Sequence, residues 1–178
     1  MRRRTPRLNR KPWDTSGGVP ARARIAVIRA EYNEEITRSL ETKCLEGLAE
    51  GGVGRDQVDC FTVPGCFEIP LVAAKLAALG CYDVIITLGA VIKGDTLHFE
   101  LVAQECARGV MNVALEQGVP VIFEVLATRT RQDARRRAGD NRMNKGFEAA
   151  RAALAMVATM GRLEEEATCR STSASKRR

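Results

Sequence analysis

Apolar runs and amphipathic stretches alternate along the chain between residues 25 and 160. Short apolar runs that suit buried strands occur at 25–29, 58–63, 83–88 and 119–126. Stretches with apolar residues at helical spacing follow them at 34–50, 67–79, 96–117 and 130–138, and another spans 145–160. Glycines at 51, 52 and 54 end the first helix, and Pro70 fits the first turn of the second. The pattern predicts four strand–helix units and one additional helix.

Continuous apolar strands that alternate with amphipathic helices are typical of a parallel sheet with helices on both faces. We therefore predict a flavodoxin-like α/β fold, a three-layer sandwich with a four-stranded parallel sheet. This domain is expected to span residues 25–161. The flanking segments 1–24 and 162–178 are rich in Arg, Ser, Thr and Gly, and we expect both to be poorly ordered.

The positive charge of the chain is concentrated at its two ends. The formal net charge is +6, but residues 1–24 hold eight basic residues and one Asp, and residues 170–178 hold four more basic residues. The segment between them is therefore mildly acidic. Nucleic-acid-binding domains more typically carry a basic patch on the folded body, so we expect no specific nucleic-acid binding. The basic ends could be solubilising extensions, or arms that contact polyanions without specificity.

Other features of the sequence limit the class of protein further. No apolar run approaches the roughly 20 residues of a membrane-spanning helix, and no apolar stretch typical of a secretory signal follows the basic start. The six cysteines form no CxxC pair and the chain has one histidine, so the spacing of zinc ligands is absent. We expect a cytoplasmic protein with free thiols, no metal site and no membrane association.

Aromatic and acidic side chains are expected at the carboxyl ends of the strands, where open parallel sheets bind their ligands. Tyr32 and Phe67 follow the first and second strands, and Phe123 lies near the end of the fourth. Three aromatic rings near one crevice suit a flat heteroaromatic ligand, although core packing is a competing interpretation for Phe123. Glu68 could accept hydrogen bonds from ring N–H groups, or could simply complement the start of a helix.

The loop after the third strand combines a histidine with a helix N-terminus. His98 falls in the first turn of a helix that Thr96 is expected to cap. A neutral imidazole there could transfer a proton, although an exposed histidine without a role fits the position equally well. The free N–H groups of the helix that Asp95 and Thr96 open form a potential anion site. Arg137 and Lys145 could hold a phosphate there, or could be ordinary exposed residues.

Four segments of the chain resemble motifs of the 6,7-dimethyl-8-ribityllumazine synthase family, which performs the penultimate step of riboflavin biosynthesis. Residues 63–70, VPGCFEIP, resemble the motif VPG(A/S)(F/W)EIP, and residues 89–99, GAVIKGDTLHF, resemble GxxI(K/R)GxTxHF/Y. Residues 137–139 and 144–146 are similar to the RAG…GNKG region, and residues 29–33 to the end of the first strand. The similarity runs in the family's order from about residue 25 to 160.

The resemblance implies a transferase without metal or organic cofactor. Its small-molecule substrates are 5-amino-6-(D-ribitylamino)uracil and 3,4-dihydroxy-2-butanone 4-phosphate, which condense with release of phosphate and water. The pyrimidine and its ribityl chain are then assigned to Tyr32, Cys66, Phe67, Glu68, Ala90, Val91, Ile92 and Phe123. The phosphate is assigned to Asp95, Thr96, Arg137 and Lys145, and proton transfer to His98.

The resemblance also implies an assembly. Members of the family form pentamers with the site between neighbouring subunits, and some pentamers build a sixty-subunit icosahedral shell. The four residues between Gly139 and Asn144 resemble the short linker of shell-forming members, so a pentamer, a decamer and a shell all remain open. A possible association with riboflavin synthase follows from the same resemblance.

The sequence departs from the family's pattern at several positions. Glu124 and Met143 stand where glycines are expected, and Cys66 replaces Ala or Ser. Asp95 stands where a small residue is common, and would repel a phosphate unless it turned away or paired with Lys93 or Arg137.

Two other functions remain open at this stage. The chain could bind a flavin or a lumazine without making it, or could form a shell whose basic ends engage polyanionic cargo. The presence of His98 and Arg137 in their expected motifs favours the enzyme.

Overall fold

The computed structural model describes the backbone of residues 23–175 and the side chains of residues 23–167. The predicted N-terminal arm, 1–24, therefore lies outside the described residues except for its last two. Four strands form one sheet in the order β2-β1-β3-β4, and every pair of neighbours is parallel. The strands are β1 (Ile25–Ala30), β2 (Val58–Val63), β3 (Val84–Ile92) and β4 (Val121–Thr128).

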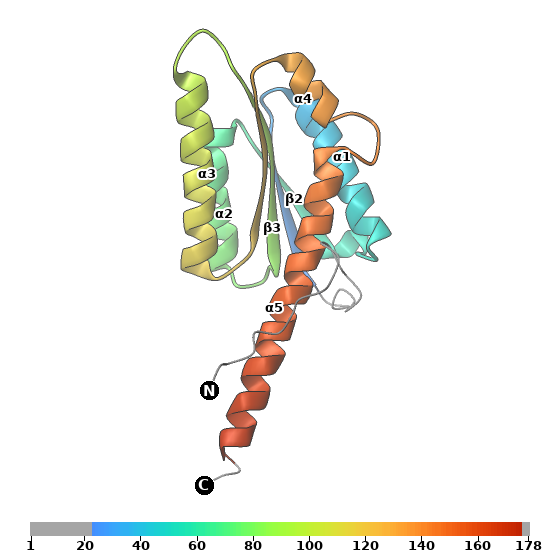
Figure 1. Cartoon of the computed structure of the whole chain (residues 1–178), viewed down its shortest axis with the longest axis vertical. Helices are drawn as coiled ribbons and strands as arrows, with labels where there is room; N and C mark the ends of the chain where they lie inside the picture. Colours follow the sequence, from blue (N-terminus) through green and yellow to red (C-terminus); the bar gives the residue numbers. More distant parts are fainter. Residues whose placement is uncertain (1–22, 176–178) are drawn as a thin grey trace, which may run out of the picture.

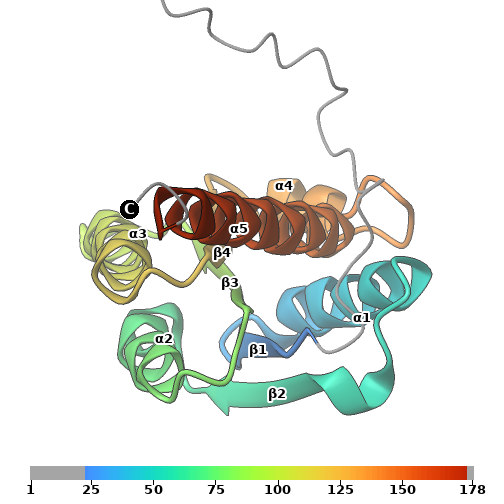
Figure 2. The ribbon, with the colours of Figure 1, turned by 90° about the horizontal axis from the view of Figure 1, so that it is seen from below.

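Helices cover both faces of this sheet (Figures 1 and 2). On one face lie α2 (Ile69–Ala78) and α3 (His98–Gln117), and on the other lie α1 (Glu34–Glu50), α4 (Arg131–Arg137) and α5 (Lys145–Ser175). Short 3-10 helices at Arg55–Gln57 and Cys66–Glu68 precede β2 and α2. The three-layer α/β fold predicted from the alternating pattern is confirmed.

The two central strands explain why the sequence favours this fold. Every residue of β1 is buried, and so are the first seven residues of β3, because each strand lies between two helical layers. The edge strands β2 and β4 mix buried positions with partly or fully exposed ones. Continuous apolar runs therefore mark the centre of the sheet, as expected for parallel strands covered on both faces.

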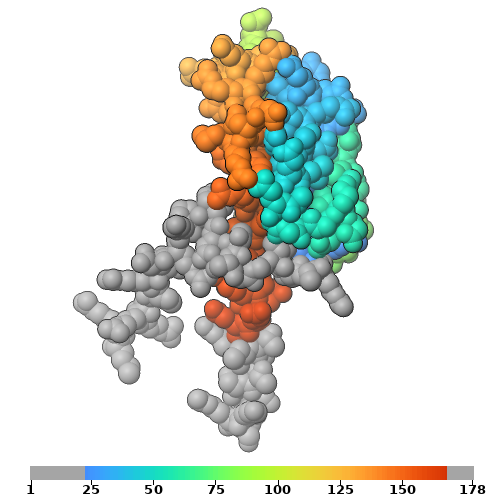
Figure 3. Space-filling model, turned by 90° about the vertical axis from the view of Figure 1, so that its right-hand side faces the viewer, coloured from blue at the N-terminus to red at the C-terminus, as the bar shows by residue number. Residues whose placement is uncertain are grey.

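Helices α1 and α5 pack closely against each other, and Figure 3 shows the residues of α1 beside those of α4 and α5 on one face of the molecule. Gly146 makes this approach possible. A Cβ atom at Gly146 would lie 1.9 Å from the backbone oxygen of Leu40, so no larger residue fits without moving a helix. The start of α5 is thereby held in a fixed position over the sheet.

Several predicted boundaries were wrong. Strand β3 continues to Ile92 through the predicted loop, because residues 90–92 pair with 126–128 of β4. Helix α3 begins at His98 with Leu97 at the N-cap, so Thr96 is not the capping residue. Helix α5 extends to Ser175, past its predicted end at residue 160 and through most of the tail expected to be poorly ordered. The segment 161–175 contains no proline that would stop a helix.

None of the helices within the described residues is both long enough and apolar enough to cross a membrane. The cysteines at 44, 60, 66, 81 and 106, whose side chains the structure describes, are free, as predicted.

Candidate active site

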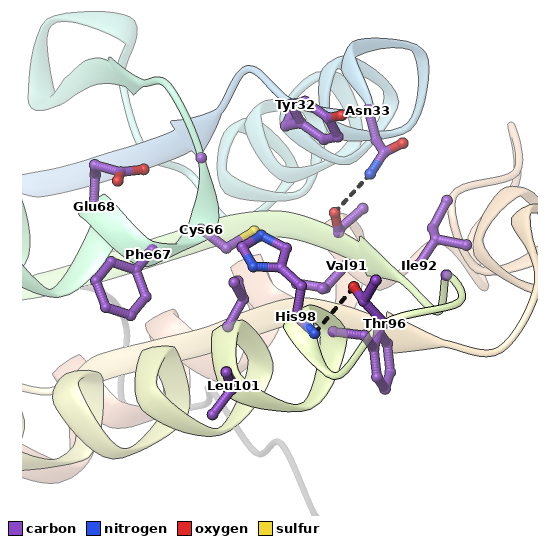
Figure 4. Close-up of a pocket in the computed structure, with 15 residues that line it drawn as sticks. Tyr32, Asn33, Cys66, Phe67, Glu68, Val91, Ile92, Thr96, His98 and Leu101 are labelled. Atoms are coloured by element: carbon purple, nitrogen blue, oxygen red, sulfur yellow. Dashed lines mark hydrogen bonds between the residues drawn. The ribbon is translucent and has the colours of Figure 1, made fainter.

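A pocket of about 690 Å³ lies at the carboxyl ends of β1, β2 and β3, beside the first turns of α3 (Figure 4). Its wall combines backbone and side chains from the segments 32–33, 65–68, 90–94 and 96–102. The end of β3 supplies one side, the 3-10 helix after β2 a second, and the start of α3 a third. This is the sheet edge at which the topology predicts ligand binding.

Nine of the predicted site residues line this single pocket. They are Tyr32, Cys66, Phe67, Glu68, Ala90, Val91, Ile92, Thr96 and His98. The rings of Tyr32 and Phe67 are exposed by 75% and 58%, respectively. Aromatic rings with this much free surface can stack on a planar ligand at low cost.

His98 is the first residue of α3, and its imidazole points into the pocket (Figure 4). Its backbone N–H donates to Oγ1 of Thr96 at 3.4 Å, which ties the loop to the start of the helix. The ring is exposed, so it can exchange protons with a ligand or with water. The position is suitable for a general acid or base.

Cys66 is buried at the back of the pocket, and burial raises the pKa of its thiol to about 11. The backbone amide of Ala90 acts on the sulfur in the opposite direction, but desolvation is the larger effect. The side chain is therefore a neutral thiol at physiological pH. Its contribution to the pocket is packing and shape.

Other residues line the pocket although they were not assigned to it from the sequence. They are Asn33, Gly65, Gly94, Phe99, Leu101 and Val102. Leu101 and Val102 lie three and four positions after His98, on the same face of α3, so helical spacing alone could have placed them. Asn33 follows the first strand, at the edge where ligands are expected, but the sequence does not reveal its left-handed backbone.

The remaining four predicted residues do not line the pocket. Phe123 lies in the middle of β4, paired with Thr87. Arg137 is exposed at the end of α4, and its guanidinium donates to the backbone oxygen of Asp133 at 3.3 Å. Lys145, at the start of α5, forms an ion pair with Glu148.

Asp95 is the fourth of these residues, and it is exposed in the loop before α3. Lys93, one of its two expected partners, instead forms an ion pair with Glu100 at 2.8 Å. This ammonium holds the pKa of Glu100 below its usual range. The cation nearest to Asp95 in sequence is therefore already engaged with another carboxylate.

The sequence of this chain is similar to a known protein family over most of its length. A family model described as 6,7-dimethyl-8-ribityllumazine synthase matches residues 22–161, which is most of the chain. The chain belongs to the 6,7-dimethyl-8-ribityllumazine synthase family. The match ends at residue 161, so the last part of α5 lies outside the matched residues.

Two curated relatives illustrate how similar the chain is to this family. The 6,7-dimethyl-8-ribityllumazine synthase of Stenotrophomonas maltophilia (strain R551-3) is 47% identical over 139 residues, which cover 78% of this chain and 90% of the relative. The enzyme of the same name from Xanthomonas campestris pv. campestris (strain B100) is 46% identical over 141 residues, or 79% and 92% of the two chains. The similarity thus extends over nearly the full length of these lumazine synthases.

Glu124, which stands where the resemblance leads us to expect a glycine, introduces a carboxyl group into β4. It is half-buried, and desolvation raises its pKa to about 7. Lys145 opposes this shift and Glu148 adds to it, so all three groups belong to one charged cluster at the start of α5. The carboxyl group therefore titrates near physiological pH.

Proposed function

We propose that this chain condenses 5-amino-6-(D-ribitylamino)uracil with 3,4-dihydroxy-2-butanone 4-phosphate to 6,7-dimethyl-8-ribityllumazine in the pocket described above. Such a reaction is a step of riboflavin biosynthesis, and the family assignment supports it. The observation that carries the site is the convergence of nine motif residues, His98 among them, on one cavity.

In this proposal the pyrimidine stacks on Tyr32 and lies between Phe67 and the end of β3. Glu68 accepts hydrogen bonds from ring N–H groups, and the neutral Cys66 thiol packs behind the ligand. Residues 90–92 provide the wall along which the ribityl chain extends. The cavity of about 690 Å³ is within the range of pockets that enclose ligands of this size.

His98 would transfer the protons of the condensation. The pyrimidine amine adds to the carbonyl of the butanone and loses water to form an imine. Elimination of phosphate follows, and the ribitylamino nitrogen then closes the second ring with loss of another water. These steps need proton transfers and an anchored leaving group, so holding the two reactants in register supplies most of the remaining acceleration.

We further propose that the site is completed by a second copy of the chain. Phe123, Arg137 and Lys145 lie outside the pocket of their own chain, yet the resemblance to the family assigns them to the substrates. Exposed apolar side chains on α3 and the loop before it support association with another surface: Leu97, Leu101, Met111 and Leu115. In a ring of identical subunits, one chain would supply the pocket with Thr96, and its neighbour would add Phe123, Arg137 and Lys145.

The test is a direct assay of the purified protein with both substrates, in which formation of the fluorescent lumazine is compared with the uncatalysed reaction. We expect catalysis above background, and a marked decrease in rate for Arg137→Ala when the butanone phosphate is below saturation. Tight binding of a lumazine or a flavin without turnover would instead identify a binding homologue, and Asp95→Gly would be the first variant to restore activity. The absence of both binding and turnover would refute the proposal.

The assembly is tested separately by light scattering and electron microscopy. We propose a pentamer as the basic unit, and particles of sixty subunits would add the icosahedral shell. Co-elution with riboflavin synthase would test the association that the resemblance implies. A monomer with full activity would contradict a site shared between chains.

A further inference from the structure

The end of β3, which forms one wall of the pocket, is supported by a strand on one side only. Strand β1 pairs with β3 as far as the register Arg29–Leu88. Residues 89–92 continue beyond that point and pair only with β4. The chain after β1 instead follows β2, because the amides of Glu31 and Tyr32 donate to the backbone oxygens of Val63 and Pro64.

Asn33 reaches back to this unsupported end. Its side-chain Nδ2 donates to the backbone oxygen of Ala90 at 2.9 Å, as the dashed line in Figure 4 shows. Ala90 begins the part of β3 that lines the pocket. A side-chain amide thus forms the hydrogen bond that a longer β1 would otherwise have provided.

Two features hold Asn33 in the orientation that this contact needs. Its backbone is in the left-handed region, with φ of 60° and ψ of 44°, and it is the only non-glycine residue with positive φ in the described part of the chain. Asparagine tolerates this conformation better than most residues. On the other side of the amide, the guanidinium of Arg131 donates to Oδ1 at 3.3 Å.

We propose that Asn33 is a positioning residue, which fixes the end of β3 so that the pocket wall at 90–92 has the shape required by the pyrimidine substrate. Arg131 orients the amide from α4. The inference rests on the proposed function for its substrate, but the tether itself can be measured without any substrate.

The decisive variant is Asn33→Gly, because glycine keeps the left-handed backbone and removes only the amide side chain. We expect the Michaelis constant for the pyrimidine to rise about tenfold, as for the loss of one partly buried hydrogen bond, with little change in kcat. Amide hydrogen exchange at residues 91–93 should accelerate by a similar factor of about ten. The control for exchange is Asn141→Gly, which removes a side chain that accepts a hydrogen bond from the amide of Met143 and should leave exchange at residues 91–93 unchanged.

A second variant covers the case in which Asn33→Gly does not fold. Asn33→Asp has nearly the same shape but cannot donate to the Ala90 oxygen, so it should show the same rise in the Michaelis constant. The inference would be overturned if Asn33→Gly kept the wild-type affinity and exchange rates while Asn33→Ala lost stability. The residue would then matter only for its left-handed backbone conformation. Faster exchange in a protein that neither binds nor converts the pyrimidine would support the tether and refute the proposed function.

Discussion

Two regions of the molecule contain the residues that the resemblance assigns to the substrates. One of them forms a pocket within a single chain, and the other does not. In the pocket region, formed by the segments 32–33, 65–68 and 90–102, the turn after β1, the 3-10 helix after β2, the end of β3 and the start of α3 line one cavity. In the flanking region, 121–148, Arg137 and Lys145 contact groups of their own helices and do not face that cavity. We propose that the first region is the substrate-binding site, and that the second is a surface that serves a neighbouring chain.

The difference follows from where each region sits on the sheet. The pocket region lies over the carboxyl ends of the three strands β2, β1 and β3, where parallel strands bring their loops together. The flanking region follows β4, which is an edge strand with no neighbour on its outer side within the described residues. No residue of the flanking region lines the pocket of its own chain, so we propose that these residues meet the ligand of a neighbouring chain.

The largest effect is expected in the pocket region. His98→Ala should lower kcat by about 10²- to 10⁴-fold, the range typical for loss of a general acid or base. Binding of the pyrimidine should be retained, because the stacking surfaces of Tyr32 and Phe67 are untouched. Steady-state kinetics together with a fluorescence titration of the pyrimidine would separate the two effects. Unchanged turnover would show that His98 is not the main proton-transfer residue.

The matching test of the flanking region is Arg137→Ala. Loss of a charge-assisted contact to phosphate should raise the Michaelis constant of the butanone phosphate by about 10- to 100-fold and leave pyrimidine binding unchanged. The control is Arg136→Ala, because Arg136 is an exposed arginine on the same helix. Its Nη2 lies 3.8 Å from Oδ1 of Asp133. Equal losses in both variants would indicate a general charge effect rather than a specific contact.

Mixed assemblies make the comparison sharper. If the two regions meet across a subunit boundary, reassembly of His98→Ala chains with Arg137→Ala chains should restore about a quarter of wild-type activity, because some boundaries then combine two intact halves. If each chain used its own Arg137, the mixture would be no more active than the average of the two separate variants.

The sequence predicts most of the fold but only part of the geometry of the pocket region. Apolar runs and helical spacing predict the sheet and the helices, because burial between layers imposes those patterns. The topology then places Tyr32, Phe67 and His98 at one edge. The sequence does not reveal contacts between residues that are far apart in the chain. Asn33 donates to the backbone oxygen of Ala90, 57 positions later, and β3 extends to Ile92 because β4 pairs with it.

Glu124, in the flanking region, is expected to make stability depend on pH. Its pKa in the folded state is raised to about 7, so the stabilising effect of the protonated form is fully present below its usual pKa and is lost as pH rises through 7. Glu124→Gln should therefore match the wild type near pH 5 and exceed it near pH 8, by at most about 3 kcal/mol. Urea unfolding at the two pH values measures this difference. Parallel pH profiles for the two proteins would contradict the assignment.

The smallest effect concerns packing beside the pocket region, where Gly89 contacts Cys66. A Cβ atom at Gly89 would lie 2.5 Å from the Cys66 sulfur and 3.2 Å from a methyl group of Val125, so the thiol occupies space that the glycine leaves open. Gly89→Ala should lower the free energy of unfolding by about 1 to 2 kcal/mol through overpacking. Adding Cys66→Ala should recover part of that loss, because the nearest clash is removed while the contact with Val125 remains. Strictly additive losses in the double variant would mean that the sulfur does not limit the space at Gly89, and that β4 alone sets the tolerance of this wall.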